Sequence, residues 1–201
     1  MWRHPALASI LVAYIGWGAW NWFIDRPVHP PDGVLAPGEP LQVDTVDAEK
    51  TQVGRWTLTT RASYHITARI LGLERYRFDR LAGLIPEDLA LGWGPMSDNR
   101  IISHMQIYQS DRFYFWRATQ DTPINRDAII VHSANTHVIP QDALVAKQLS
   151  RLRPGEVVTL SGDLVDAERD DGARIKTSMV RTDTGAGACE VMLVRDVELL
   201  P

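Results

Sequence analysis

Cysteine is nearly absent from this 201-residue chain, which contains Cys189 and no other thiol. An intrachain disulfide and a zinc site of the CxxC type are both excluded, because each needs at least two cysteines. A single cysteine is compatible with the cytoplasm, and also with a bacterial periplasmic domain large enough to fold without disulfides. It is not typical of a small, disulfide-rich secreted module.

The chain also lacks an excess of positive charge, with a formal net charge of -4. Beyond residue 26 there are 19 Lys and Arg residues against 24 Asp and Glu residues, a balance of -5. Nucleic-acid binding and docking onto an anionic membrane surface both depend on clustered cations. We therefore expect no nucleic-acid partner.

Long apolar runs are missing as well, with one exception at the N-terminus. Ala6–Ile24 contains 19 residues and no charge. As a helix at ~1.5 Å per residue it would span about 28 Å, close to the hydrocarbon thickness of a bilayer. Trp17, Trp20, Trp22 and Phe23 gather at its C-terminal end, as in the aromatic belt of a membrane interface. The pattern predicts that residues 1–26 form a single transmembrane anchor and that residues 6–24 contact membrane lipid.

Two alternatives to an anchor are a cleaved signal peptide and a buried helix of a soluble domain. A signal peptide should end in a small-residue cleavage site, whereas tryptophans occupy that zone here. Arg3 precedes the run and Arg26 follows it, so the positive-inside bias only slightly favours a cytoplasmic N-terminus. On this interpretation the remaining domain lies in the periplasm, tethered to a bacterial inner membrane, where other envelope proteins could be partners.

Residues 27–40 contain five prolines and two glycines, which indicates a stiff extended linker, or else an irregular loop packed on the domain. Residues 41–201 then form the soluble domain. Hydrophobic residues make up 45% of the chain, enough to build a core. Strands are predicted over residues 56–60, 63–71, 112–116, 128–131, 155–166, 175–181 and 190–197.

The strand over residues 112–116 is aromatic on both faces, which predicts burial on both sides. Gly162 indicates a kink, and Asp170–Gly172 indicates a hairpin turn. Helices are predicted over 140–152 and, more briefly, over 86–91. This mainly β pattern with one or two helices favours a small OB-like or SH3-like barrel, with a sandwich as the second choice.

The string Asp183-Thr184-Gly185-Ala186 resembles the catalytic signature of aspartic proteases. Arg181 stands where that family has an apolar residue, and only 16 residues follow Gly185, too few for the rest of the protease site. The plainer interpretation is a glycine-rich turn capped by Asp183.

Cys189 follows the same turn, and a nucleophilic thiol needs a nearby base. His132 or His137 could supply one only through the fold. The simpler interpretation is a buried, inert thiol that packs as a small hydrophobe. The two histidines are five residues apart and lack the spacing of known metal motifs, so we predict a polar loop there, no metal site and no cofactor.

Trp93 lies between two glycines, and Arg112, Tyr114 and Trp116 lie in the aromatic strand. Together these four could line a groove for a ligand such as a sugar or an extended peptide. The alternative is that Trp93 closes one end of the barrel as a packing residue.

Three segments, LALGWGPMSD (89–98), HSANTHVIP (132–140) and RTDTGAGACE (181–190), resemble those of an uncharacterised family of bacterial proteins with an N-terminal membrane helix. The resemblance covers nearly the whole chain, implies an inner-membrane location and implies no activity. The first functional hypothesis is therefore a membrane-tethered binding or assembly module of the envelope. The alternatives are a hydrolase using Asp183, or Cys189 with a histidine, and an OB-type domain for oligosaccharide or single-stranded nucleic acid.

Overall fold

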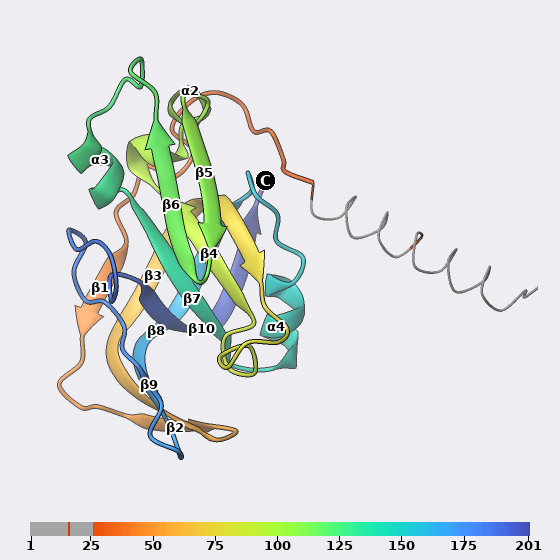
Figure 1. Cartoon of the computed structure of the whole chain (residues 1–201), viewed down its shortest axis with the longest axis vertical. Coiled ribbons are helices and arrows are strands. Elements are labelled where there is room, and N and C mark those ends of the chain that lie inside the picture. The colour runs from red at the N-terminus through yellow and green to blue at the C-terminus, as the bar shows by residue number, and fades with distance from the viewer. Residues whose placement is uncertain (1–15, 17–25) are drawn as a thin grey trace, which may run out of the picture.

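The computed structural model describes residue 16 and residues 26–201, and most of its regular structure is β-strand (Figure 1). The mainly β class expected from the sequence is confirmed. The strands are β1 (Leu41–Asp44), β2 (Lys50–Val53), β3 (Trp56–Arg75), β4 (Glu87–Gly92), β5 (Met105–Ser110), β6 (Phe113–Ala118), β7 (Ser133–Pro140), β8 (Val157–Arg169), β9 (Arg174–Ile175) and β10 (Glu190–Leu200). The helices are η1 (Gly94–Ser97), α2 (Asn99–Ile102), α3 (Arg126–Val131) and α4 (Ala143–Leu149).

The long strand β3 connects the two ends of the main sheet. Its residues Trp56–Arg69 pair with β8, and its C-terminal part, Arg69–Arg75, pairs with β4. β4 pairs in turn with β7, β7 with β10, and β10 with β8, so the hydrogen-bonded circuit returns to β3. Within this circuit β7 and β10 are parallel and the other pairs are antiparallel.

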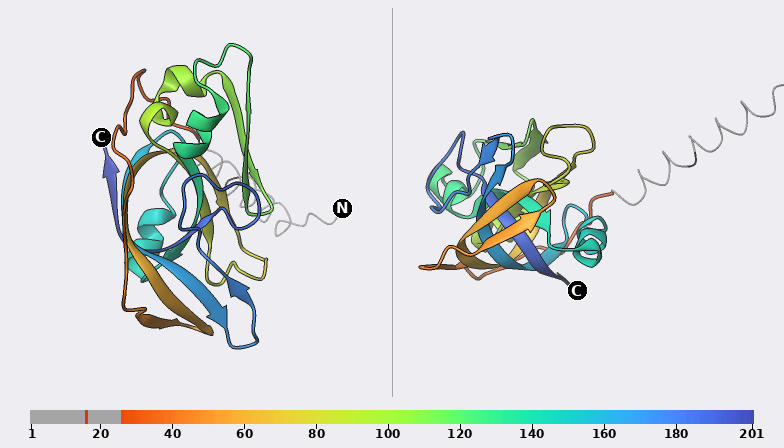
Figure 2. Two further views of the ribbon diagram at one scale, coloured as in Figure 1. Left: turned by 90° about the vertical axis from the view of Figure 1, so that its left-hand side faces the viewer. Right: turned by 90° about the horizontal axis from the view of Figure 1, so that it is seen from below.

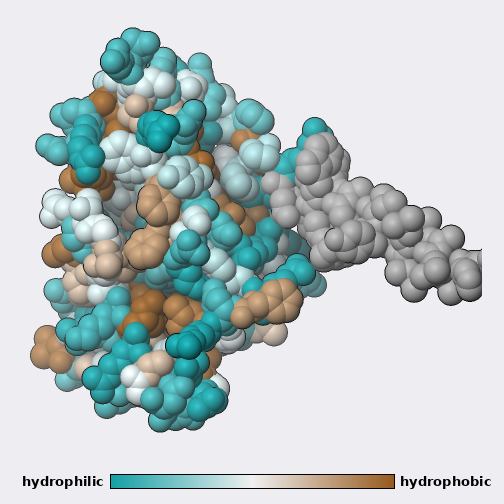
Figure 3. Space-filling view, in the orientation of Figure 1, coloured by the Kyte–Doolittle hydropathy of each residue, from teal (hydrophilic) through white to brown (hydrophobic). Residues whose placement is uncertain are grey.

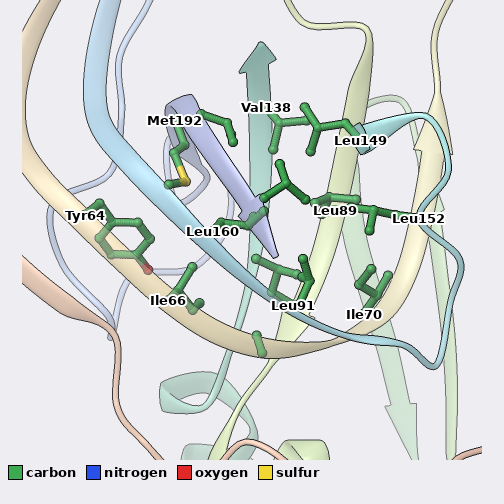
Figure 4. Packing of buried hydrophobic residues seen from close by; sticks show 14 of the residues in the cluster. Tyr64, Ile66, Ile70, Leu89, Leu91, Val138, Leu149, Leu152, Leu160 and Met192 are labelled. Atoms are coloured by element: carbon green, nitrogen blue, oxygen red, sulfur yellow. The ribbon is translucent and has the colours of Figure 1, made fainter. Parts of the chain in front are cut away.

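Buried apolar side chains alternate with more exposed ones along the strands, and the buried ones form the core. In β3 the side chains of Tyr64, Ile66, Ala68 and Ile70 are almost completely buried. They meet apolar side chains from β4, β7, β8 and β10 inside the circuit (Figure 4). The helix predicted over 140–152 is present as α4, capped by Asp142, and adds Val145 and Leu149 to this core.

Gly162 of β8 lies where two strands approach closely. A Cβ atom added there would lie 2.0 Å from the carbonyl oxygen of Leu193 in β10. The register between these strands shifts beside this point, between Val194 and Asp196. The irregularity expected at Gly162 is therefore a close backbone contact next to a bulge on the neighbouring strand.

β5 and β6 form a separate hairpin that stands outside the curved main sheet (Figure 2). Its two-residue turn, Asp111–Arg112, has φ values of 51° and 67°, as a type I′ turn requires. The expectation that residues 112–116 are buried on both sides is wrong. Phe113 and Phe115 remain 38% and 41% exposed, because the hairpin has the main sheet on one side only.

Three other local predictions fail around β4 and β7. Residues 86–91 form strand β4 rather than a helix, and residues 128–131 end helix α3, which Asn125 caps, rather than forming a strand. Residues 133–140, expected as a polar loop, form the central strand β7. Of the strand expected over 175–181, only Ile175 pairs. In each case pairing or capping by distant or flanking residues outweighs local propensity.

The segment before β1 packs on the domain. The amide of Val28 donates to Pro154, and the amides of Leu35 and Ala36 donate to the Ser97 hydroxyl. These contacts match the interpretation of residues 27–40 as a surface loop rather than a free spacer. The predicted anchor over 6–24 falls outside the described residues, apart from Gly16. Among the described residues, no helix has the length and apolar character needed to cross a membrane.

Candidate active site

Three neighbouring strands bring Asp88, His137 and Cys189 together on the outer face of the main sheet. Asp88 of β4 is the direct cross-strand neighbour of His137 in β7. On the other side of β7, His137 is in register with Val191 of β10, and Cys189 precedes Val191 by two residues. Cys189 lies just before β10, and its contacts with Asn135 and His137 place its side chain on that same side.

The imidazole of His137 connects the carboxylate to the thiol. Its Nδ1 lies 2.7 Å from Oδ1 of Asp88, and both side chains are buried. Burial acts to lower the pKa of His137, but hydrogen bonds and charge interactions with Asp88 and Cys189 outweigh it and raise the pKa to about 9. His137 is therefore an imidazolium at neutral pH.

Asn135, two residues before His137 on the same face of β7, approaches the sulfur atom directly. Its Nδ2 lies 3.5 Å from Sγ of Cys189 and also donates to the carbonyl of Arg112. Its Oδ1 accepts from Nε2 of Gln109 in β5 at 2.9 Å. These bonds fix the amide with its NH₂ group toward the thiol.

The β5–β6 hairpin covers the carboxylate end of this arrangement. The guanidinium of Arg112 donates to Asp88, to Asp79 and to the carbonyl of Ile85, and it stacks 3.8 Å from the ring of Tyr76. The hydrogen bond from Arg112, opposed by partial burial, lowers the pKa of Asp79. Arg112 thus attaches the hairpin turn to the sheet and neutralises buried Asp88.

The thiol end opens into a cleft of about 330 Å³. Cys189 is partly exposed there, which corrects the expectation that this thiol is buried. The cleft is lined by Phe113–Trp116 of β6, Arg126 and Ile130 of α3, Ser133–Asn135 of β7, and residues 183–185 and 188–189 of the loop before β10.

Asp183 shares this cleft with Cys189. Its Oδ2 accepts a hydrogen bond of 2.6 Å from the hydroxyl of Ser178, and Gly185 and Gly187 after it have positive φ values. The glycine-rich turn considered in the sequence is present, closed by a bond from the Ala188 amide to the Gly185 carbonyl, and Asp183 bonds to Ser178 beside it. Asp183 therefore borders the cleft, while the carboxylate that contacts His137 is Asp88.

The four residues predicted to line a ligand groove separate into three environments. Tyr114 and Trp116 line the cleft, whereas Arg112 is committed to the ion pairs beneath the hairpin. Trp93 is completely buried in the apolar core of the main sheet, and its Nε1 donates to Glu39 at 2.8 Å. Of the three residues proposed for catalysis, Asp183 and Cys189 line the cleft and His137 lies behind Cys189.

Sequence reasoning missed Asp88 and Asn135. Asp88 was assigned to the first turn of a helix, where a carboxylate is common. The available signal was an acidic pair, Glu87-Asp88, inside the apolar run 84–91, since carboxylates buried among apolar residues need partners. Asn135 carried no signal of its own, because its position depends on β7 being a strand.

Glu190, the residue after Cys189, is buried on the opposite face of the sheet. It pairs with Arg181 at 2.9 Å, and burial, partly offset by Arg181, raises its pKa to about 7. The arginine–glutamate pair is therefore separate from the site that contains His137 and Cys189.

Comparisons with protein-family models, with curated proteins and with solved structures gave no match to this chain. Any functional conclusion therefore comes from the site geometry.

The raised pKa of His137 makes stability depend on pH. His137 stabilises the folded state fully below pH 6.5, and this contribution is lost as pH rises through about 9. Protonated Glu190 likewise stabilises the folded state fully below pH 4.5, and this contribution is lost as pH rises through about 7. We expect the wild-type protein to lose roughly 2 kcal/mol of unfolding free energy between pH 7 and 9 through His137.

Urea unfolding at a series of pH values measures this loss. The His137→Gln protein serves as the control, and its stability should change much less over the same range. Parallel pH profiles for the two proteins would show that His137 does not titrate in this window.

Proposed function

We propose that this chain is a thiol-dependent hydrolase in which Cys189 is the nucleophile, His137 the acid–base group and Asp88 the group that orients the imidazole. The observation that carries the proposal is the line of carboxylate, imidazole and thiol across β4, β7 and β10, with its thiol end in a cleft. Nucleophilic catalysis requires a nucleophile that contacts a base, and a third group that holds the base in position by a hydrogen bond. The three side chains here are arranged in this order.

The reaction would take place at an acyl carbon bound in the cleft. The Cys189 thiolate attacks the carbonyl carbon, a sulfur–carbon bond forms, and the carbon–leaving-group bond breaks as His137 transfers its proton to the leaving amine or alcohol. Water then attacks the thioester while neutral His137 accepts a proton. The carbon–sulfur bond breaks, a carboxylic acid leaves, and the thiolate is restored.

Asn135 is the candidate for stabilising the negative charge that develops on the carbonyl oxygen. Its NH₂ group is held beside Sγ, where a substrate carbonyl would lie during attack. A preorganised side-chain amide donor of this kind can contribute about 10²–10³-fold to the rate in hydrolases. Gln109 and the carbonyl of Arg112 keep the amide in this orientation before substrate binds.

The architecture that we propose around this site is a closed, OB-like barrel made by the circuit β3–β4–β7–β10–β8. Its support is the strand order, the parallel β7–β10 pair and helix α4 between β7 and β8. OB domains bind ligands on the face of their second and third strands, here β4 and β7. The cleft borders this face, although a fold analogy alone does not define a reaction.

A binding module without catalytic chemistry is the second candidate function. Tyr114 and Trp116 line the cleft, and aromatic side chains commonly line sites for sugars and peptides. The acidic balance of the chain argues against nucleic acid as the ligand. This candidate requires that Cys189 takes no part in a reaction, and acetylation of the thiol by an ester would distinguish it from the hydrolase.

We also propose that residues 6–24 tether the domain to a bacterial inner membrane with the domain in the periplasm. Support comes from the uncharged run of 19 residues and its aromatic end. Fractionation tests the tether: the full-length chain should stay with membranes until detergent is added, and recovery in the aqueous fraction would refute it.

The proposed activity is tested with p-nitrophenyl acetate, a small reactive ester, on the full-length protein. We expect acetylation of Cys189, detected by mass spectrometry, followed by turnover as water hydrolyses the thioester. His137→Gln should slow acetylation about tenfold or more at pH 7, because it removes the acid–base group beside the thiol.

His132→Gln is the matched control, since His132 contacts Ala128 and Glu39 rather than the thiol, and it should react at the wild-type rate. Equal acetylation rates for the wild type and His137→Gln would show that His137 does not activate Cys189. The binding module would then be the better candidate.

A further inference from the structure

The strand β6 presents its backbone edge to the cleft. It pairs with β5 on one side and has no strand partner on the other side among the residues that the structure describes. Four consecutive residues, Phe113–Trp116, line the cleft. Successive side chains of a strand point to opposite faces, so four in a row border one cavity only when that cavity lies along the edge of the strand.

The hairpin register identifies the backbone groups at this edge. Phe113 and Ser110 flank the two-residue turn and bond to each other, so Tyr114 and Trp116 occupy the alternate positions whose N–H and C=O point away from β5. Within residue 16 and residues 26–201, no hydrogen bond reaches those backbone groups of Tyr114 and Trp116. They are available at the edge of the cleft that contains Cys189.

We propose that the substrate is an extended peptide segment that binds as a third strand along the free edge of β6; this inference rests on the proposed hydrolase function. An unpaired strand edge recognises the main chain of an extended peptide through alternating N–H and C=O groups. The edge would hold the peptide in the same cleft as the thiol, so that one of its carbonyl groups lies at Sγ.

The composition of the cleft adds a side-chain preference. Phe113, Phe115 and Ile130 give it apolar walls, which suits an apolar or aromatic peptide side chain. A volume of about 330 Å³ is at the low end for ligand sites, ~300–1,000 Å³, and suits a short segment rather than a folded partner. Figure 3 agrees: hydrophobic residues on the face with β5 and β6 are interspersed with hydrophilic ones and form no single large patch.

Binding is tested on the full-length Cys189→Ala protein, which cannot react, with the capped peptide acetyl-Ala-Ala-Phe-Ala-Ala-amide. Two analogues carry an N-methyl group on the central Phe or on the Ala after it, so each blocks one edge of the peptide strand. We expect one analogue to bind about tenfold more weakly than the parent and the other to bind like it, since strand pairing uses one edge. The backbone amides of Tyr114 and Trp116 should gain protection from hydrogen exchange.

A matched pair of variants tests the protein side. Trp116→Pro removes both the indole and the edge N–H, whereas Trp116→Leu removes the indole alone. We expect the proline variant to bind the parent peptide several-fold more weakly than the leucine variant. Equal binding of all three peptides, or no binding of the parent at millimolar concentration, overturns the inference even if the proline variant fails to fold.

This result is separable from the test of the proposed function. If the peptide binds but p-nitrophenyl acetate does not acetylate Cys189, the strand-pairing site is supported and the proposed hydrolase activity is refuted. If Cys189 is acetylated and turns over but the peptide does not bind, the hydrolase activity is supported and an extended peptide is refuted as its substrate.

Discussion

The register of β7 between β4 and β10 is the constraint on which the site depends. With this register, Val138 points into the apolar core while His137 points outward, opposite Asp88 and beside Cys189, which lies just before β10. A slip of one residue would exchange the two faces of β7, placing an imidazole in the apolar core. The apolar packing of the interior therefore fixes the outer residues, and the site needs no separate device to hold its main chain.

Burial gives this arrangement its electrostatic character. Asp88 is fully buried, and a carboxylate in such a place must be paired. It receives both the Arg112 guanidinium and the His137 imidazole, and the contact with Asp88 helps to raise the pKa of that imidazole. The same hairpin that supplies Arg112 leaves β6 with one edge that pairs with no strand within residues 26–201. One structural element therefore both supports the ion pairs of Asp88 and provides this edge at the cleft.

Local signals in the sequence were sufficient for part of this structure. The alternation in β3, the capped helix α4, the turn at Gly172 and the final strand could all be predicted, because each depends on nearby residues. β4 and β7 could not: the acidic pair at Glu87 and the polar residues after His132 imitate a helix start and a loop. Only pairing with distant strands makes them strands, and that pairing also creates the contact between Asp88 and His137.

The protonation of His137 is the most direct measure of the central claim that carboxylate, imidazole and thiol act as one unit. Nitrogen chemical shifts of its ring, recorded by NMR across pH 5 to 10, report that state without any substrate. We expect an imidazolium that persists at pH 8 in the wild type and loses its proton at lower pH when Asp88 is replaced by Asn. A neutral ring at pH 7.5 that is insensitive to Asp88 would contradict the claim.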